Sequence, residues 1–316
     1  MIPSQPPRRP QLGFLVVPPY RIQGLSIAGE ETAVQIPELD VCFDIGVCYR
    51  AALASKYIAL THGHMDHAAG LAYYFSQRQF QGMGVGTVVC HQRIAEAIHN
   101  VMKAWVALDS QVTPYNVVPL VADQELEIKP QTFLRAFETV HTVPSLGYCI
   151  IERRSKLRED LAGVPQEKLI ELKKAGEQIT REIEVPHVCC LGDTMWGEHF
   201  DRPDVRSARI LITECTFLEP GHRDRAVVGR HLHVDDIARL LEISEAEAVV
   251  LTHLSRRSHI GQARECLRQA IPAKHLDRVH ILMDSRANRS RYEQQLAEAE
   301  ADAEQPNPEA VDAEEE

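Results

Sequence analysis

The sequence lacks any apolar run that approaches the length of a membrane span. Two arginines stand near its start, but the apolar stretch that follows them is short and is interrupted by prolines, unlike a signal peptide. We therefore expect a protein that resides in the cytoplasm and does not enter a membrane.

C-x-x-C spacing is also absent, although the chain has eight cysteines. Most of them lie in apolar, strand-like runs such as VCFDI and HVCCL, where cysteine acts as a small hydrophobic residue. Because no export signal is seen, we expect reduced core thiols rather than disulfides or thiolate metal ligands.

Basic residues are missing from residues 292–316, which contain ten acidic residues. This segment explains almost all of the net charge of −11, since the rest of the chain holds 34 basic and 35 acidic residues. The near-neutral body neither requires nor excludes a polyanionic partner. We expect a flexible leader at residues 1–12, one domain at 13–291 and a disordered acidic tail at 292–316.

The sequence does contain a series of strand-like runs that are followed by helix-like segments. KYIALTH, VCCLG and AVVLT are such runs, and helices are expected over residues 66–80 and 93–108. A charged, helix-prone insertion occupies residues 153–184. The alternation predicts an α/β sandwich with a functional site on the loops at one edge of its sheets.

The segment THGHMDH ends one of these runs and is the strongest chemical signal. It places His62, His64, Asp66 and His67 at a strand-to-helix junction. Neutral imidazole nitrogen and carboxylate oxygen are the ligands that zinc and similar metals prefer. Surface histidines are the alternative, but so much polarity directly after a buried strand would be costly without a ligand.

One segment cannot fill two metal sites, and further candidates stand at other strand ends. His141, Asp193 and His253 each follow an apolar run. Any one of them alone could equally be a satisfied surface residue. Taken together, they complete a plausible dinuclear site.

Several motifs carry a family resemblance over roughly residues 20–285. They are FDIGVC, LTHGHMDH, HTVPSLGY, GEQIT, LGDT, ECTF, HLHVDDI and LTHLSRR. The chain resembles the metallo-β-lactamase superfamily and, within it, the tRNase Z (ribonuclease Z) family in its short, plant-type form. The resemblance implies an αββα sandwich with a short inserted basic arm.

The resemblance also implies two divalent metal ions, with Zn²⁺ expected and Mn²⁺ or Fe²⁺ as alternatives. One ion would take His62, His64 and His141, the other Asp66, His67 and His253, with Asp193 bridging both. Asp66, Glu214 and His231 would be catalytic, and His231 would protonate the departing 3′ oxygen while Glu214 fixes its tautomer.

The implied activity is that of a metal-dependent phosphodiesterase: a tRNA 3′-processing endoribonuclease that uses a metal-bridging hydroxide. Precursor tRNA would be its substrate, and we expect a homodimer. Arg153, Arg154, Lys156 and Arg158 are the expected RNA contacts. The alternative for these four is a solvated helix face, since residues 152–184 hold eight basic and eight acidic residues.

Two departures from the family pattern bear on the substrate. The motif usually ending in tyrosine reads Ser255-Arg256-Arg257-Ser258, and residues 79–86, where short forms carry basic residues, have no charge. The alternative function is therefore a small-molecule metallo-hydrolase acting on a thioester, lactone, sulfate ester or cyclic nucleotide. A non-catalytic RNA-binding protein is disfavoured, because every ligand position holds a suitable residue.

Overall fold

The computed structural model describes residues 12–304, and the strands among them form two seven-stranded sheets. The expected leader, apart from residue 12, and the last part of the expected tail lie outside this range. The first sheet has the order β1 (Gly13–Val17), β2 (Tyr20–Ile27), β3 (Glu31–Ile36), β4 (Val41–Phe43), β5 (Tyr57–Ala59), β6 (Thr87–His91), β7 (Asn116–Leu120).

The second sheet has the order β14 (Val279–Ile281), β13 (Ala248–Thr252), β12 (Ile210–Glu214), β11 (Thr180–Cys190), β10 (Leu146–Leu157), β9 (Thr132–Glu138), β8 (Glu125–Lys129). In both sheets antiparallel neighbours occupy one part and parallel neighbours the other. Parallel pairing needs crossover connections, and the helices of the chain supply them.

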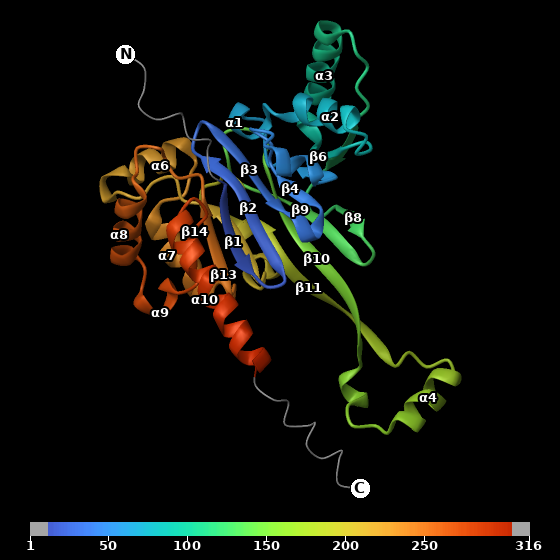
Figure 1. Ribbon diagram of the computed structural model, residues 1–316. Coiled ribbons are helices and arrows are strands. Elements are labelled where there is room, and N and C mark those ends of the chain that lie inside the picture. Colours follow the sequence, from blue (N-terminus) through green and yellow to red (C-terminus); the bar gives the residue numbers. More distant parts are fainter. Residues whose placement is uncertain (1–11, 305–316) are drawn as a thin grey trace, which may run out of the picture.

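The helices lie outside the two sheets (Figure 1). They are α1 (Met65–Ala68), α2 (Leu71–Phe80), α3 (Ala95–Asp109), α4 (Gln166–Lys174), α5 (Pro203–Arg206), α6 (Arg223–Gly229), α7 (Val234–Ile243), α8 (Ile260–Ala270), α9 (Ala273–Leu276) and α10 (Ser285–Glu304). Short 3-10 turns span Pro37–Leu39, Arg50–Ala54, Gln92–Ile94, Glu159–Leu161, Glu198–Asp201 and Pro220–His222.

Three apolar clusters hold these layers together. Between the sheets, Leu15 and Val34 of the first sheet pack with residues such as Tyr148 of the second. α2 and α3 cover the outer face of the first sheet, and α7 and α8 cover that of the second. Alternate residues of each buried strand face either the central cluster or a helix layer, so the predicted αββα sandwich is confirmed.

The helix expected over residues 66–80 is two helices, because the chain turns between α1 and α2 at Gly70. The Gly70 N–H donates to the carbonyl of Ile45 at 2.8 Å. A Cβ at this position would lie 2.4 Å from that same oxygen. This close approach anchors α1 against the loop after β4, and so positions the first metal-type residues.

The insertion at residues 153–184 differs from the helix-prone segment expected. Its two ends extend β10 and β11 into a two-stranded ribbon, and α4 provides its main helix. Ion pairs across the ribbon, such as Arg153 with Glu184, favour this pairing over helix. The ribbon projects from the sandwich at the end opposite α1 (Figure 1).

The acidic segment from residue 292 begins as structure rather than as the disorder that we expected. α10 continues through it to Glu304. Tyr292 packs edge-on against Phe14 with ring centroids 6.1 Å apart, and the Gln295 amide donates to the carbonyl of Val16 at 3.3 Å. α10 thereby docks against β1. Within residues 12–304, no helix combines the length and the apolar character that crossing a membrane would need.

Candidate metal centre

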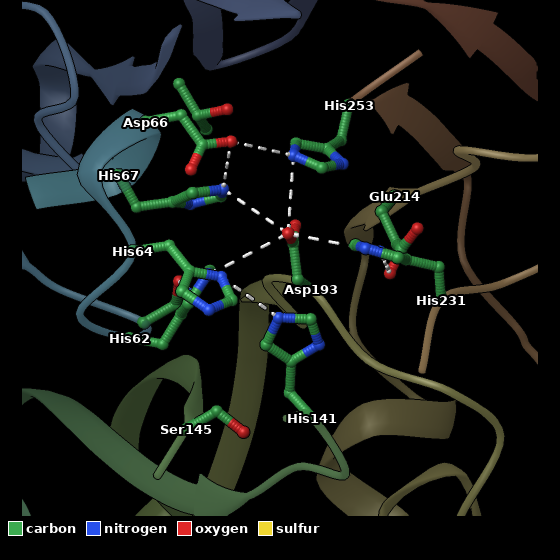
Figure 2. Close-up of polar contacts among 12 residues, drawn as sticks. His62, His64, Asp66, His67, His141, Ser145, Asp193, Glu214, His231 and His253 are labelled. Carbon is green, nitrogen blue, oxygen red and sulfur yellow. Dashed lines mark hydrogen bonds and ion pairs between the residues drawn. The ribbon is translucent and has the colours of Figure 1, made fainter. Parts of the chain in front are cut away.

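The seven predicted ligands come together at one edge of the two sheets (Figure 2). They lie in the loop after β5, at the start of α1, and in the loops after β9, β11 and β13. The residues are His62, His64, Asp66, His67, His141, Asp193 and His253, which form overlapping groups with ligand atoms within 4.8 Å of one another.

Three imidazoles form the first group. Nε2 of His62 lies 3.0 Å from Nδ1 of His64, and Nε2 of His141 lies 3.3 Å from the same Nδ1. Nitrogens bound at 2.0–2.1 Å to a tetrahedral zinc ion lie roughly 3.3 Å from one another. The three rings therefore have the spacing that one ion requires.

Asp66, His67 and His253 form the second group. Oδ2 of Asp66 lies 3.5 Å from Nε2 of His67 and 3.3 Å from Nε2 of His253. The N–H of Gly29 donates to the same carboxylate oxygen at 2.9 Å and helps to fix it.

Asp193 lies between the two groups (Figure 2). Its Oδ2 is 3.9 Å from Nε2 of His62 in the first group, and 3.4 Å and 3.3 Å from Nε2 of His67 and His253 in the second. A single carboxylate that faces both groups is placed to touch both ions of a dinuclear centre.

The ring nitrogens that point away from the centre are held by oxygens. This arrangement fixes the tautomer and orientation of a metal-ligating histidine. The pairs are His62 with Thr61 Oγ1 at 3.0 Å, His67 with Asp44 Oδ2 at 2.7 Å, His141 with the Arg230 carbonyl at 3.2 Å, and His253 with Thr216 Oγ1 at 2.9 Å.

The electrostatics of the centre favour a cation. Nε2 of His67 is buried and has no hydrogen-bond partner among the described residues. Burial lowers the pKa of His67, but Asp193 and Asp44 outweigh it and hold that pKa well above its usual value. A positive charge is therefore stabilised at this point, and the residues fit a bound divalent metal.

The two carboxylates of the centre remain ionised. Burial raises the pKa of Asp193, but the imidazoles of His253 and His67 outweigh burial and hold it well below its usual range. The pKa of Asp66 is lowered to about 2, because the hydrogen bond and charge of His253 together with His67 overcome its burial. Both can bind a metal throughout the neutral range.

Left-handed backbone conformations shape the strand ends at the centre. Asp44 and His253 have φ angles of 59° and 55°, which are uncommon for residues with a side chain. Gly192 has a φ of 62°, and a Cβ there would lie 2.7 Å from Cβ of Thr61. These turns direct Asp44, Asp193 and His253 toward the same edge at a cost in strain of about 1–3 kcal/mol per non-glycine residue.

Glu214 and His231 form a pair beside the predicted ligands, as the resemblance implied. Oε1 of Glu214 lies 2.8 Å from Nδ1 of His231, and the N–H of Thr194 donates to the same oxygen at 2.8 Å. Burial lowers the pKa of His231, but its contact with Glu214 outweighs burial and raises that pKa above 6.5. The other ring nitrogen, Nε2, has no hydrogen-bond partner among the described residues.

The four expected RNA contacts lie away from the metal ligands, and three of them form ion pairs with acidic side chains. Arg153 pairs with Glu125 and Glu184 and stacks on Phe133. Arg154 pairs with Glu152, and Arg158 with Asp160. Lys156 has no ion pair among the described residues. All four lie on the ribbon, which leaves the body at the end opposite α1 (Figure 1).

The residues that orient the ligands were not anticipated from the sequence. Asp44 closes a strand-like run just as Asp193 does, so the same rule could have found it. Thr216 and Arg230 carry no comparable signal. His233, which the sequence left undecided, is buried and caps α7, and its Nε2 contacts the carbonyl of Glu219.

Comparison with known proteins shows which family the chain belongs to. Residues 50–254 match the family model of the beta-lactamase superfamily domain. The tRNase Z TRZ1 of Arabidopsis thaliana is 31% identical over 83% of this chain and 95% of its own length. The nuclear ribonuclease Z of Triticum aestivum is 34% identical over 52% of this chain and 93% of its own length.

The chain belongs to the metallo-β-lactamase superfamily and, within it, to the tRNase Z family. This confirms the resemblance carried by the sequence motifs. Among solved structures, human tRNase Z, short form, aligns with a TM-score of 0.54 at 20% identity, covering 85% of this chain and 95% of that one. The metallo-beta-lactamase fold protein YhfI from Bacillus subtilis aligns with a TM-score of 0.58 at 16% identity, again over 85% and 95%.

Family membership, together with the His/Asp clusters, makes the chain a metal-dependent hydrolase that binds divalent metal. The two solved structures support the fold alone. The metal-ligand set rests on the geometry of this chain's own side chains.

Proposed function

We propose that the chain is a tRNA 3′-processing endoribonuclease that cuts a phosphodiester of precursor tRNA and leaves a 3′-hydroxyl on the tRNA. The observation that carries this proposal is the contact of Glu214 with His231 directly beside the ligand cluster. A poor leaving group such as an RNA 3′ oxygen needs a proton as its bond to phosphorus breaks, and this pair can supply one.

The proposed centre holds two divalent metals, and Zn²⁺ suits its nitrogen-rich ligands better than Mn²⁺ or Fe²⁺. His62, His64 and His141 would hold one ion, and Asp66, His67 and His253 the other, with Asp193 shared. When bound, such a pair supplies an activated water and neutralises charge on the phosphodiester.

His231 acts on the departing oxygen in this proposal. Nδ1–H of His231 donates a hydrogen bond to Glu214, so Nε2 is the nitrogen that would face substrate in this proposal. Because Glu214 raises the pKa of His231, a larger fraction of the ring is protonated at neutral pH. The proton passes from Nε2 to the 3′ oxygen, and Glu214 stabilises the charged ring before the transfer.

The ribbon favours a large substrate over the small-molecule alternative. β10 begins beside the centre, where the Leu146 N–H donates to the carbonyl of Thr61. From Leu146 to Leu157 the strand extends roughly 35 Å at 3.3 Å per residue. A thioester, lactone or cyclic nucleotide cannot touch both ends of this distance, whereas a folded RNA can.

We propose that Lys156 and the lysines of α4 make the first contacts of the ribbon with RNA. Lys168, Lys173 and Lys174 have no ion pair among the described residues, like Lys156. Arg153, Arg154 and Arg158 would join by exchanging their carboxylate partners for phosphate. Exposed ion pairs of this kind contribute only about 0–1 kcal/mol, so the exchange is inexpensive.

We also propose a homodimer that uses the outer face of α2 and α3. Large apolar side chains that are at least half exposed lie on these helices and on the loop after α3: Tyr73 and Phe80 on α2, Val101, Trp105 and Leu108 on α3, and Val112 on the loop. Apolar patches of this kind mark protein contacts. Leu108→Glu should shift the sedimentation mass toward a monomer, while Val228→Glu on the exposed face of α6 should not. A monomeric parent protein would contradict the proposal.

The cytoplasm is the proposed compartment. All eight cysteines are free thiols, six of them buried and two, Cys48 and Cys266, partly buried. A reducing environment is where such a set persists.

The test of the function is incubation of the metal-loaded chain with a precursor tRNA bearing a 3′ trailer, beside ester and cyclic phosphodiester substrates. We expect one cut near the end of the acceptor stem, with a 3′-hydroxyl on the tRNA and a 5′-phosphate on the trailer. Chelation should abolish the cut. Turnover of a small ester or cyclic nucleotide with no cleavage of the RNA would establish the alternative function.

A further inference from the structure

A polar hollow of about 300 Å³ adjoins the centre on the far side of His141. It is formed by the end of β6, the loop between β9 and β10, and the end of α6. His141 lines the hollow, and Nε2 of its ring lies 3.3 Å from Nδ1 of His64 in the first ligand group. The hollow is therefore one residue away from the proposed reaction.

Two arginines line this hollow without a carboxylate partner. Neither Arg93 nor Arg230 forms an ion pair among residues 12–304, although many other arginines in this range do. Nη1 of Arg230 donates to the carbonyl of His141 at 2.6 Å, and its other guanidinium donors have no partner in the described part of the chain. Guanidinium groups without a carboxylate partner that line one hollow are suited to a phosphate, which accepts their hydrogen bonds bidentately.

The position of Arg230 is fixed from two directions. Its backbone adopts a left-handed conformation with a φ of 54°. Its carbonyl contacts Nδ1 of His141 at 3.2 Å while its side chain holds the His141 carbonyl. This reciprocal contact ties the arginine rigidly to a proposed metal ligand.

His91 adds a directed donor to the same hollow. The ring is 5% exposed, and Nδ1 accepts the N–H of Arg93 at 3.0 Å. The proton of the neutral ring is therefore on Nε2, which has no hydrogen-bond partner in the part of the chain that the structure describes. This N–H is free to donate to an acceptor that enters the hollow.

Acid is scarce around the hollow. Glu138, which is exposed, is the one carboxylate among the lining residues. The hydroxyls of Thr139 and Ser145 complete the polar wall, with Thr139 Oγ1 donating to Ser145 Oγ at 2.8 Å. Two guanidinium groups against one carboxylate favour an anion over a cation in this hollow.

We propose that this hollow, the Arg93–Arg230 pocket, binds a second phosphate of the RNA, belonging to a nucleotide next to the one that is cut. The inference rests on the proposed function and deepens it. Binding at this point would set the register of the strand across the centre, because the pocket and the first ligand group share His141.

The test pairs a charge removed from the protein with a charge removed from the RNA. The metal-loaded chain is given RNAs in which one linkage at a time, stepping away from the cut, is a neutral methylphosphonate. We expect one such linkage to lower kcat/KM roughly tenfold, as for loss of a charge-assisted hydrogen bond. Arg93→Gln should cause a similar loss on the ordinary RNA and little further loss on that one modified RNA.

Matched variants give the test its control. Arg289→Gln removes the same charge from an exposed site on α10 and should show no coupling to any linkage. Arg93→Lys should retain part of the effect, and Glu138→Gln should lower KM. Equal sensitivity of the Arg93→Gln variant to every linkage would overturn the pocket.

The same set of protein variants and modified RNAs distinguishes failure of the proposed pocket from failure of the proposed reaction. If the chain cuts none of these RNAs, equilibrium binding of the same oligonucleotides replaces kcat/KM. If the Arg93→Gln variant and one modified linkage then lower the binding affinity non-additively, the pocket is supported and the proposed reaction is contradicted. Cleavage with no coupling would uphold the reaction and remove the pocket.

Discussion

Oδ2 of Asp44 lies 2.7 Å from Nδ1 of His67, and this contact decides which nitrogen of the ring faces Asp193. Both side chains are buried, and the other oxygen of Asp44 accepts the Thr61 N–H at 2.7 Å. Asp44 therefore orients a proposed ligand without touching the metal position itself.

Asp44→Asn should weaken metal binding by roughly 10- to 100-fold, the usual effect of losing such an outer contact. The amide can donate where the carboxylate accepted, which turns the His67 tautomer the wrong way. Competition with a chelating dye would measure the loss. Asp109→Asn, at the exposed end of α3, is the control. Unchanged affinity in a folded Asp44→Asn protein would contradict the orienting role.

Removing Asp193 should affect both metals, whereas removing His253 should affect chiefly one. Asp193 faces both groups, but His253 faces only the second. Metal analysis after dialysis should give well under one ion per chain for Asp193→Ala and close to one for His253→Ala. If the two variants lost metal equally, the assignment of a shared carboxylate would be wrong.

His231→Ala should lower turnover of RNA by roughly 10²- to 10⁴-fold, the usual value of a positioned acid, with metal content nearly unchanged. Glu214→Ala should cause a smaller loss, and the double variant should be little worse than His231→Ala, because the two act as a unit.

The leaving group provides the control for His231. An activated aryl phosphodiester departs without a proton, so its turnover should depend far less on His231. Equal sensitivity of both substrates would make His231 a binding residue rather than the acid.

Acid should destabilise the fold through His199 and His280. Burial, with a smaller contribution from the charge of Arg202, lowers the pKa of His199 to about 4. Burial, with a smaller contribution from the charge of Arg291, likewise lowers the pKa of His280 to about 4. The unfolded rings titrate near 6.5, so this stability is complete above pH 6.5 and is lost as the pH falls toward 4. Each group contributes about 1.4 kcal/mol per pH unit within that window.

Denaturant unfolding between pH 7 and pH 4.5 measures this effect. His280→Gln should make the free energy of unfolding fall less steeply with pH than in the parent protein. His99→Gln, at an exposed position on α3, should leave the slope as it was. Identical slopes for all three proteins would show that His280 takes up its proton equally well in the folded state.

The effect of removing the acidic C-terminal segment on stability should depend on where the chain is cut. Cutting after Arg291 removes the contacts of Tyr292 and Gln295 with β1 and should lower the unfolding temperature. Cutting after Glu304 keeps them and still removes five acidic residues. That shorter cut should leave stability unchanged and strengthen RNA binding modestly at low salt, because acidic charge repels phosphate over roughly 10 Å. Equal unfolding temperatures for both truncations would contradict the docking of α10.

The ligand set was predictable because its members share a visible pattern: a His or Asp directly after an apolar run. That pattern exposes His62 after β5 of the first sheet, and His141, Asp193 and His253 after β9, β11 and β13 of the second, since strands that run in the same direction end at the same edge. Asp44 follows the same pattern, but nothing in the sequence says which strand end faces His67.

Other features depend on contacts between distant segments. The break at Gly70 comes from the approach of Ile45, and the ribbon comes from pairing across residues 153–184, where helix-prone composition competes with cross-strand ion pairs. Arg230 orients His141 through its backbone, so its residue type gives no signal. Local sequence propensity does not report such contacts, and they account for most of the differences between the predicted and the observed structure.

In the proposed function, the ribbon would let the enzyme select its substrate by length. The tip and the centre lie at opposite ends of the molecule (Figure 1), so the tip contributes binding energy only to an RNA long and stiff enough to reach both. A shortened RNA with an unaltered cleavage point would lose that energy in KM, while its chemical step would proceed at the usual rate. The proposed function would thus separate selection by length at the ribbon from selection by chemistry at the centre, and either one could change in evolution without altering the other.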